Sequence, residues 1–309
     1  MTPASRRHAV AFCVDAGYLP FAAHAAMQVA ALDPDDRFDI LICSATPLTL
    51  PPALDGGRVR CVHVDAAVEG MMLKGHVSVS AYLLLHLAEH LGDAYDRVFY
   101  LDADIFVQGG DFAALMDVDL AGRSVGAVRD MIQWLTPGRH AEEFRIMGLP
   151  HAPYFNSGAV LIDTAAWRGR GVTARAVELS VTRGAEFPLH DQSVLNVALH
   201  NDWAELSPTW NWHGFKSTRL AETMVHPNVM HFTSPVKPWN DTDDLTPPRF
   251  SRPIHDFVTR HFPDTAILPP GRPALNARRM RRLAIRTWKI APGLSRYLSR
   301  FPTDLTVHT

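Results

Sequence analysis

The amino-acid sequence predicts an α/β fold built on a mainly parallel β-sheet. Short apolar runs of strand length alternate along the chain with longer segments that carry apolar residues at helical spacing, as in strand–helix–strand units. The 309 residues, 47% of them hydrophobic, are enough for a sizeable buried core. The 20% of charged residues is too low for a disordered chain.

The elements follow one another in a regular order. His8–Val14 predicts a first buried strand, and Leu19–Leu32 predicts a helix that ends at Asp33-Pro34. Apolar residues at helical spacing predict a second helix over Val77–Leu91. Further strands are predicted at Phe38–Cys43, Arg58–Val64, Arg97–Leu101, Ser124–Val128 and Ala159–Ile162. In such sheets, ligands bind beyond the carboxyl ends of the strands.

Turn-rich sequence at Asn240–Pro248 suggests a division of the chain. We expect a catalytic domain over residues 1–245 and a C-terminal extension over 246–309. Residues 272–301 hold nine basic residues and no acidic one, which leaves 21 basic against 32 acidic residues elsewhere. The extension therefore carries the positive charge of an otherwise acidic protein.

The C-terminal extension predicts a basic amphipathic helix. Ala274–Ile290 places Leu, Met, Ile and Trp side chains among arginines, a pattern typical of a helix lying on anionic lipid. The alternative is a helix whose basic face is simply solvated, and nucleic acid is the less favoured anionic partner. We therefore expect residues 272–301 to bind an anionic membrane and not nucleic acid.

The apolar runs of the sequence are too short for a signal peptide or a membrane span. The apolar run near Met1–Val14 is cut by Asp15 and is too short for a signal peptide. No run of about eighteen apolar residues spans a bilayer. Cys13, Cys43 and Cys61 lie in apolar runs and predict buried free thiols. We expect a cytoplasmic protein, peripheral at the inner face of the membrane.

The most informative segment is the strand Arg97–Leu101, which runs into Asp102 and Asp104. In extended backbone, residues two apart point to the same side, so two carboxylates are presented together. Paired carboxylates repel unless a cation lies between them, and a divalent ion with oxygen ligands resolves this. A turn or helix cap at the strand's end is the alternative interpretation.

A second segment adds nitrogen ligands. His231 ends a short apolar run and Lys237 follows six residues later. Imidazole suits Mn²⁺ better than Mg²⁺, and lysine is a good partner for phosphate. A hydrogen-bonded structural role is the alternative for His231.

These segments belong to an ordered set of motifs: a turn at Asp15–Tyr18, Tyr-Leu-Asp-Ala-Asp at 100–104, Tyr-Phe-Asn-Ser-Gly-Ala-Val-Leu-Ile-Asp at 154–163, His-Asp-Gln-Ser-Val-Leu-Asn at 190–196, Trp-Asn-Trp at 210–212 and His-Phe-Thr-Ser-Pro-Val-Lys-Pro-Trp at 231–239. The set covers about residues 8 to 240 and resembles glycosyltransferase family 8, which contains bacterial lipopolysaccharide galactosyl- and glucosyltransferases and glycogenin.

The resemblance implies a GT-A fold, a Rossmann-like nucleotide-sugar-binding domain. It also implies a nucleotide-sugar donor, UDP-galactose or UDP-glucose, and transfer of the hexose with retention to a saccharide acceptor such as lipopolysaccharide or another surface glycan. Mn²⁺ is the implied cofactor, with Mg²⁺ as the alternative. By motif position, Asp102, Asp104 and His231 match the metal ligands, so the resemblance implies a metal-dependent hexosyltransferase.

The remaining site residues also follow from the resemblance. Asp15 and Tyr18 match a nucleoside-binding turn, and Asp102, Asp104 and Lys237 match diphosphate contacts. Around the sugars the matching positions are Asn156, Ser157, Asp191 and Gln192, with the last two as catalytic candidates. Because an amide does not titrate, we expect Gln192 to orient the sugar or to stabilise a cationic centre through its carbonyl.

Structural alternatives stand beside these roles: a tight turn for 156–158 and a helix N-cap for Asp191. Two positions depart from the family pattern. Leu84 replaces a basic residue that often follows the tyrosine at 82, and Ser234 replaces a glycine. The competing functions are a metal-dependent phosphoester hydrolase and a nucleotide-sugar-binding protein without catalysis.

Overall fold

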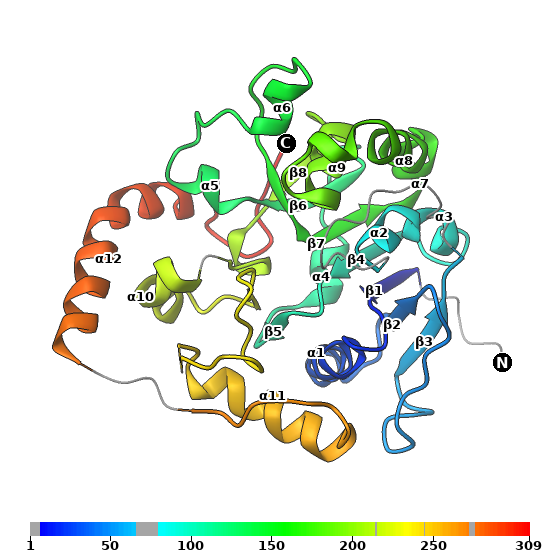
Figure 1. The fold of residues 1–309 in the computed structure, drawn as a ribbon. Helices are drawn as coiled ribbons and strands as arrows, with labels where there is room; N and C mark the ends of the chain where they lie inside the picture. The colour runs from blue at the N-terminus through cyan, green and yellow to red at the C-terminus, as the bar shows by residue number, and fades with distance from the viewer. Residues whose placement is uncertain (1–6, 66–79, 214, 244, 272–275) are drawn as a thin grey trace.

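The computed structural model describes residues 7–65, 80–213, 215–243, 245–271 and 276–309. Its centre is an eight-stranded mixed sheet in the order β10-β8-β6-β7-β4-β1-β2-β3, with helices on both faces (Figure 1). The strands are β1 His8–Cys13, β2 Asp39–Ser44, β3 Val59–His63, β4 Arg97–Leu101, β6 Val125–Arg129, β7 Phe155–Asp163, β8 Trp203–Leu206 and β10 Val307–His308. A separate two-stranded sheet pairs β5 Ile105–Val107 with β9 Val229–His231.

The helices connect and cover these strands. They are α1 Leu19–Leu32, α2 Ser80–Leu83, α3 Leu87–Leu91, α4 Phe112–Met116, α5 Met131–Trp134, α6 Glu142–Ile146, α7 Thr164–Gly169, α8 Val172–Arg183, α9 His190–Ala198, α10 Phe215–Val225, α11 Pro248–His261 and α12 Ala277–Leu298. Short 3₁₀ turns lie at η1 Leu84–His86, η2 Gly184–Glu186 and η3 Pro208–Trp210.

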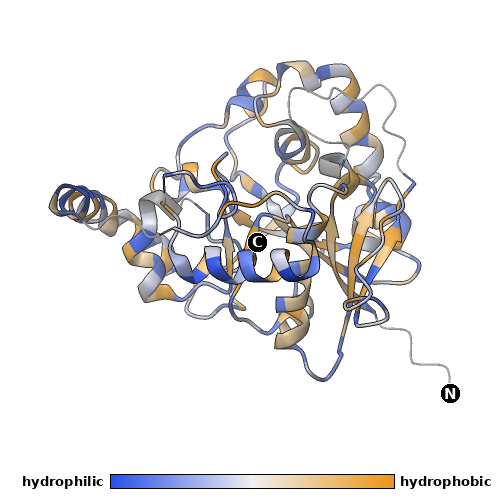
Figure 2. Cartoon of the chain, turned by 60° about the horizontal axis from the view of Figure 1, so that its bottom comes forward, coloured by the Kyte–Doolittle hydropathy of each residue, from blue (hydrophilic) through white to orange (hydrophobic). Residues whose placement is uncertain are grey.

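Strand β1 shows why the sheet is buried on both sides. Its side chains alternate, so that Val10 and Phe12 pack in one apolar cluster and Ala9, Ala11 and Cys13 in the other. Helix α1 belongs to the first cluster, and α8 and α9 contribute to the second. Figure 2 shows the apolar strands between helices that expose polar residues. The predicted α/β fold with a mostly parallel sheet is confirmed.

Sheet direction places several chain segments at one edge. Strands β3, β2, β1 and β4 run parallel, with Phe12 beside Leu101, so the residues that follow β1 and β4 emerge together. Strand β7 is antiparallel to both β4 and β6 and interrupts the parallel order. Asp15 and Asp102 therefore lie at the same end of the sheet.

Most predicted elements are confirmed, with three differences. The helix predicted over 77–91 is interrupted by η1, and its first residues lie outside the described ones. The strand predicted at 159–162 begins four residues earlier. Helix α12 extends beyond residue 290 to Leu298, while 274 and 275 are not described. Cys13 and Cys43 are buried free thiols as predicted, whereas Cys61 is half-buried.

The C-terminal segment returns to the body of the protein. After α12, β10 pairs antiparallel with β8, and the Asp304 backbone oxygen accepts a hydrogen bond from the Trp210 indole (2.8 Å). Domain boundaries at 245 and 246 remain a prediction. Among the described residues, no helix is both long and apolar enough to cross a bilayer.

Candidate active site

The carboxylate pair is fixed by backbone hydrogen bonds on both sides. The Asp102 N–H donates to the Gly158 oxygen (2.9 Å) at the end of β4, and the Asp104 oxygen accepts from the Phe232 N–H (2.9 Å). The segment between the two residues bends and is not a continued strand, so the extended geometry expected from the sequence is wrong here. The bend leads into β5, whose pairing with β9 brings in the third ligand.

His231 meets both carboxylates. It ends β9 opposite Ile105, and its imidazole Nε2 lies 3.1 Å from Asp104 Oδ1 and 3.4 Å from Asp102 Oδ2. One ligand atom from each of the three side chains falls within 4.8 Å of the others. Two carboxylate oxygens and one imidazole nitrogen form a donor set that fits Mn²⁺.

The electrostatics of the group favour positive charge. Lys237 forms an ion pair with Asp104 and donates to the Phe232 oxygen (2.7 Å). Burial opposes protonation of His231, but the charges of Asp104 and Asp102 outweigh it and raise the imidazole pKa to about 9. Burial likewise opposes ionisation of Asp104, yet His231 and Lys237 hold its pKa well below the ordinary value. The two carboxylates therefore stabilise positive charge on the neighbouring His231 and Lys237 side chains.

A chain of side-chain amides orients the imidazole. The Gly158 N–H donates to Asn156 Oδ1 (3.1 Å), and Asn211 Nδ2 donates to the same oxygen (2.8 Å). Because a backbone N–H can only donate, this bond fixes the orientation of both amides. Asn211 Oδ1 then accepts from His231 Nδ1 (2.9 Å). The proton is thereby held on Nδ1, and Nε2 is directed at the carboxylates as a metal ligand.

Gly158 leaves room for this arrangement. A Cβ at this position would lie 2.1 Å from His231 Cε1 and 2.6 Å from Asp102 Oδ2. These separations are far below van der Waals contact. The close approach of β7 to the metal-binding group therefore requires glycine.

Gln192 and Ser157 lie beside this chain of amides. Gln192 Oε1 accepts from Asn156 Nδ2 (2.9 Å) and from the Ser157 N–H (3.2 Å), while its Nε2 donates to Asp130 Oδ2 (3.3 Å). Asn156 and Ser157 belong to β7, so the tight turn considered for residues 156–158 is wrong. The structure brings the predicted sugar-binding residues together with Asp130.

Asp191 accepts a hydrogen bond from the Ser157 hydroxyl (3.1 Å). Burial, reinforced by the negative charge of Asp102, raises the Asp191 pKa to about 7. The residue lies inside the first turn of α9, whose N-cap is Leu189, so the N-cap considered for Asp191 is wrong. Asp191 is thus a half-buried carboxyl whose pKa responds to the charge of Asp102 in the metal-binding group.

The turn after β1 completes the site. Asp15 Oδ1 accepts from the Gly17 N–H (3.0 Å) and the Tyr18 N–H (3.2 Å), which fixes the entry into α1. The Tyr18 ring is 41% exposed and meets Trp239 edge-on, with ring centroids 6.2 Å apart. Burial and the charge of Asp104 raise the pKa of the Tyr18 hydroxyl.

The sequence model of glycosyltransferase family 8 matches residues 64–243. The chain belongs to glycosyltransferase family 8. It is 32% identical over 189 residues to the glycosyltransferase GlyF of Streptococcus pneumoniae, covering 59% of this chain and 43% of GlyF. It is 28% identical over 170 residues to the lipopolysaccharide 1,3-galactosyltransferase of Salmonella typhimurium, covering 52% of this chain and 49% of that protein.

The fold of this family 8 chain resembles that of a solved relative. The galactosyltransferase LgtC, crystallised with donor and acceptor sugar analogs, superimposes with a TM-score of 0.66 at 22% identity. The match covers 84% of this chain and 97% of LgtC, which supports the predicted GT-A fold. The chain spans less than half the length of the two curated relatives named above.

Both departures from the family pattern have structural counterparts. Leu84 is fully buried among Leu83 and Leu85, so this position faces the core and not the site. The Ser234 hydroxyl donates to the Val236 backbone oxygen (2.7 Å), so this side chain bonds within its own loop.

Sequence reasoning missed three residues of the site. Asp130 follows β6 directly, as Asp102 follows β4, so the same rule identifies it. Asn211 lies between two fully buried tryptophans, Trp210 and Trp212, in the motif at 210–212. The close approach at Gly158 depends on β7 meeting His231, which the local sequence does not indicate.

Proposed function

We propose that this family 8 chain transfers a hexose from UDP-galactose or UDP-glucose to a saccharide acceptor such as lipopolysaccharide or another surface glycan, with retention at the anomeric carbon. The observation that carries the proposal is the convergence of Asp102, Asp104 and His231 beside Lys237. The galactosyltransferase names of two relatives support the choice of donor and acceptor.

The metal-binding group supplies the electrostatics of the reaction. Asp102, Asp104 and His231 would hold Mn²⁺, or alternatively Mg²⁺. A divalent ion held by these residues would neutralise the charge that develops on a departing nucleotide diphosphate, which is worth on the order of 10³-fold in rate. Lys237, whose ammonium group lies at Asp104, adds a second positive charge for the phosphates.

The neighbouring residues place the substrates. Asp15 shapes the turn that presents Tyr18 to the nucleoside. Gln192 Oε1 already accepts two hydrogen bonds, so we assign this side chain to orienting the sugar and not to stabilising a cation. Asp191, Asn156 and Ser157 would hydrogen-bond sugar hydroxyls. No general base is required, because the departing phosphate can accept the proton of the acceptor hydroxyl.

The test is UDP formation from a panel of UDP-sugars, with and without Mn²⁺ and with and without saccharide acceptors. We expect Asp102→Asn to lower the rate by about 10³-fold, whereas Asp264→Asn, an exposed carboxylate elsewhere, leaves it unchanged. UDP release that ignores the acceptor would favour a hydrolase, and UDP binding without turnover would favour a non-catalytic binding protein. The anomer of the product, measured by NMR, checks retention.

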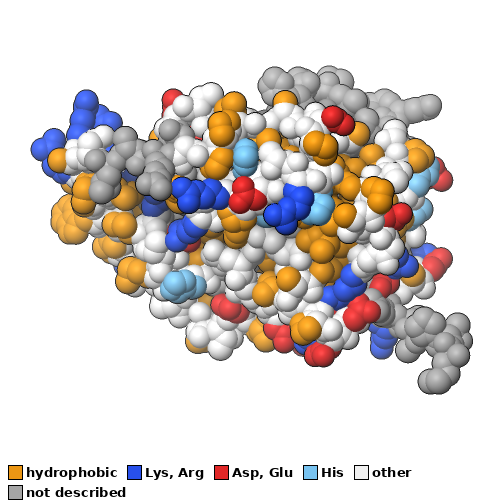
Figure 3. Space-filling model, turned by 90° about the horizontal axis from the view of Figure 1, so that it is seen from below, with side chains coloured by type: hydrophobic (Ala, Val, Ile, Leu, Met, Phe, Trp, Pro, Cys, Tyr) orange, Lys and Arg blue, Asp and Glu red, His pale blue; other side chains and the backbone are white. Residues whose placement is uncertain are grey.

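We also propose that α12 holds the protein at the cytoplasmic face of an anionic membrane. Trp288 is 77% exposed and Met280 55% exposed on a helix that also exposes Arg281 and Arg282. Figure 3 shows basic and hydrophobic side chains gathered side by side at the end of the molecule where α12 lies. Apolar side chains among cations are typical of helices that lie in the lipid interface.

The membrane proposal is tested by sedimentation with vesicles of phosphatidylglycerol and of phosphatidylcholine. Wild-type protein should bind only the anionic vesicles. Replacing Arg281, Arg282 and Trp288 by Ser should abolish binding, while Arg175→Ser on α8 should not. Equal sedimentation of the α12 variant and the wild-type protein would contradict the proposal.

A further inference from the structure

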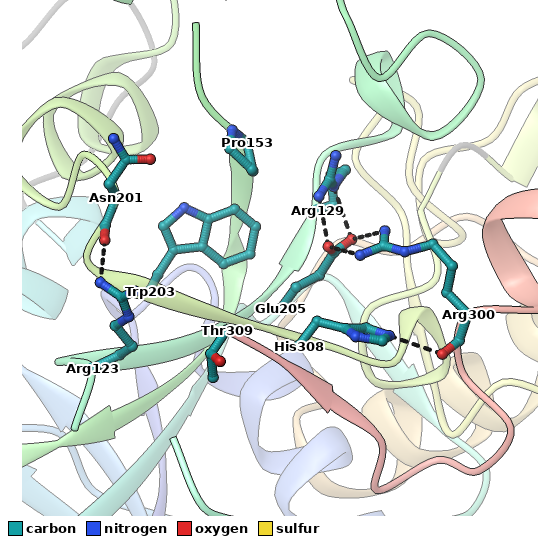
Figure 4. A pocket seen from close by; sticks show the side chains of 9 residues that line it. All are labelled: Arg123, Arg129, Pro153, Asn201, Trp203, Glu205, Arg300, His308 and Thr309. Carbon is teal, nitrogen blue, oxygen red and sulfur yellow. Dashed lines mark hydrogen bonds and ion pairs between the residues drawn. The ribbon is translucent and has the colours of Figure 1, made fainter. Parts of the chain in front are cut away.

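A cleft of about 430 Å³ lies along the edge of the sheet where β8 pairs with β6 and β10 (Figure 4). None of the residues proposed for sugar transfer lines it. Its floor is formed by Arg129, Trp203 and Glu205, all at least nine-tenths buried, and its rim includes Arg123, Asn201 and Arg300.

One end of the cleft concentrates positive charge. Glu205 accepts from Arg129 Nε (2.8 Å) and Nη2 (2.6 Å), and from Arg300 Nη1 (3.1 Å) and Nη2 (2.8 Å). The Tyr297 hydroxyl also donates to this carboxylate (3.0 Å). One carboxylate therefore fixes two guanidinium groups but neutralises the charge of only one. Each guanidinium has five N–H donors and uses two of its nitrogen atoms to bind Glu205, so further N–H groups remain for a ligand.

The other end holds a further cation. The Arg123 guanidinium donates to the backbone oxygen of Asn201 (2.5 Å) and has no carboxylate partner within the part of the chain that the structure describes. Trp203 lies between the two charged ends in Figure 4, with its ring packed edge-on against Phe155 at a centroid distance of 5.3 Å. The cleft thus combines an aromatic wall with an excess of arginine.

We propose that this cleft binds an anionic saccharide, a phosphorylated or carboxylated sugar. Its anionic group would pair with guanidinium N–H groups, which match phosphate and carboxylate geometry. The apolar face of the sugar ring would pack on Trp203. Such binding does not depend on the sugar-transfer reaction. That the ligand is an acidic part of the acceptor glycan is a further step, which rests on the proposed function.

The test is calorimetric titration of the metal-free protein at low salt with glucose 6-phosphate, glucuronic acid, glucose and inorganic phosphate. Both anionic sugars should bind, glucose should not, and inorganic phosphate should bind more weakly than glucose 6-phosphate. Arg123→Gln and Asn201→Asp should each weaken binding by about tenfold or more, because each removes positive charge or adds negative charge at the rim.

Matched measurements separate this site from the metal-binding group. Arg175→Gln, an exposed arginine on α8, should bind the sugars as the wild-type protein does. Aspartate tolerates the left-handed backbone at Asn201 (φ 60°), so Asn201→Asp should keep the fold and its UDP affinity in Mn²⁺. Binding that neither rim variant changes would overturn the proposal, as would no binding at millimolar sugar. Equal affinity for inorganic phosphate and glucose 6-phosphate would show that the cleft binds anions without recognising the sugar, and would also overturn the proposal.

Discussion

Replacement of Gly158 by alanine is the sharpest perturbation of the metal-binding group. The added Cβ would lie 2.1 Å from His231 Cε1, whereas carbon atoms in contact are about 3.5–4.0 Å apart. Either His231 or β7 must therefore shift by about 1.5 Å. Displacements of about 1 Å cost roughly 10²-fold in well-organised sites, so we expect Mn²⁺ affinity to fall by about 10²-fold.

The assay is calorimetric titration with Mn²⁺, accompanied by circular dichroism to verify the fold. Gly169→Ala is the matched control, because nothing lies within 4 Å of a Cβ built at that glycine. It should bind Mn²⁺ with wild-type affinity. A folded Gly158→Ala protein with undiminished Mn²⁺ affinity would show that the ion does not bind among Asp102, Asp104 and His231.

Three further predictions concern orientation and protonation. Asn211→Leu removes the acceptor for His231 Nδ1 and should lower the Mn²⁺ affinity by about 10- to 100-fold. Asn211→Asp, which keeps an acceptor oxygen, should restore part of that affinity. An unchanged affinity in Asn211→Leu would show that Asn211 does not position His231. Because the His231 pKa is raised to about 9, Mn²⁺ must displace a proton at pH 7, so its affinity should rise with pH toward 9. Titrations in buffers of different ionisation enthalpy measure that proton, and its absence would contradict the assignment. Burial lowers the His24 pKa to about 4. Between about pH 6.5 and 4, His24 is therefore protonated in the unfolded chain but not in the native protein. The free energy of unfolding should fall by up to about 3 kcal/mol as the pH drops through this range. Urea unfolding of His24→Leu should show a weaker pH dependence in that window.

The metal-binding group shows what a sequence can predict. Asp102 and Asp104 follow a buried strand, and the ends of neighbouring parallel strands meet at one edge, so their proximity to the Asp15 turn follows from the fold class. Recognition of His231 needed the family resemblance, because nothing in its local sequence separates a ligand from a structural histidine. The structure adds the reason for their convergence, which is the pairing of β5 with β9.

Orientation within the site could not be predicted in the same way. Asn156, Asn211 and Gln192 lie on three separate segments, and their mutual hydrogen bonds depend on side-chain placement at the scale of single ångströms. The bend at Asp102–Asp104 also escaped prediction; the Asp104 oxygen there accepts a hydrogen bond from the Phe232 N–H, which is distant in sequence. Patterns of residue type locate elements, while contacts between loops decide geometry.

The pairing of β10 with β8 has a consequence for self-association. Strand β8 would otherwise be the last strand on that side of the sheet, with unpaired N–H and C=O groups open to another chain. Removing the residues from α12 onward would therefore invite edge-to-edge aggregation in addition to any loss of lipid binding. Substitution of exposed arginines on α12 keeps that edge capped.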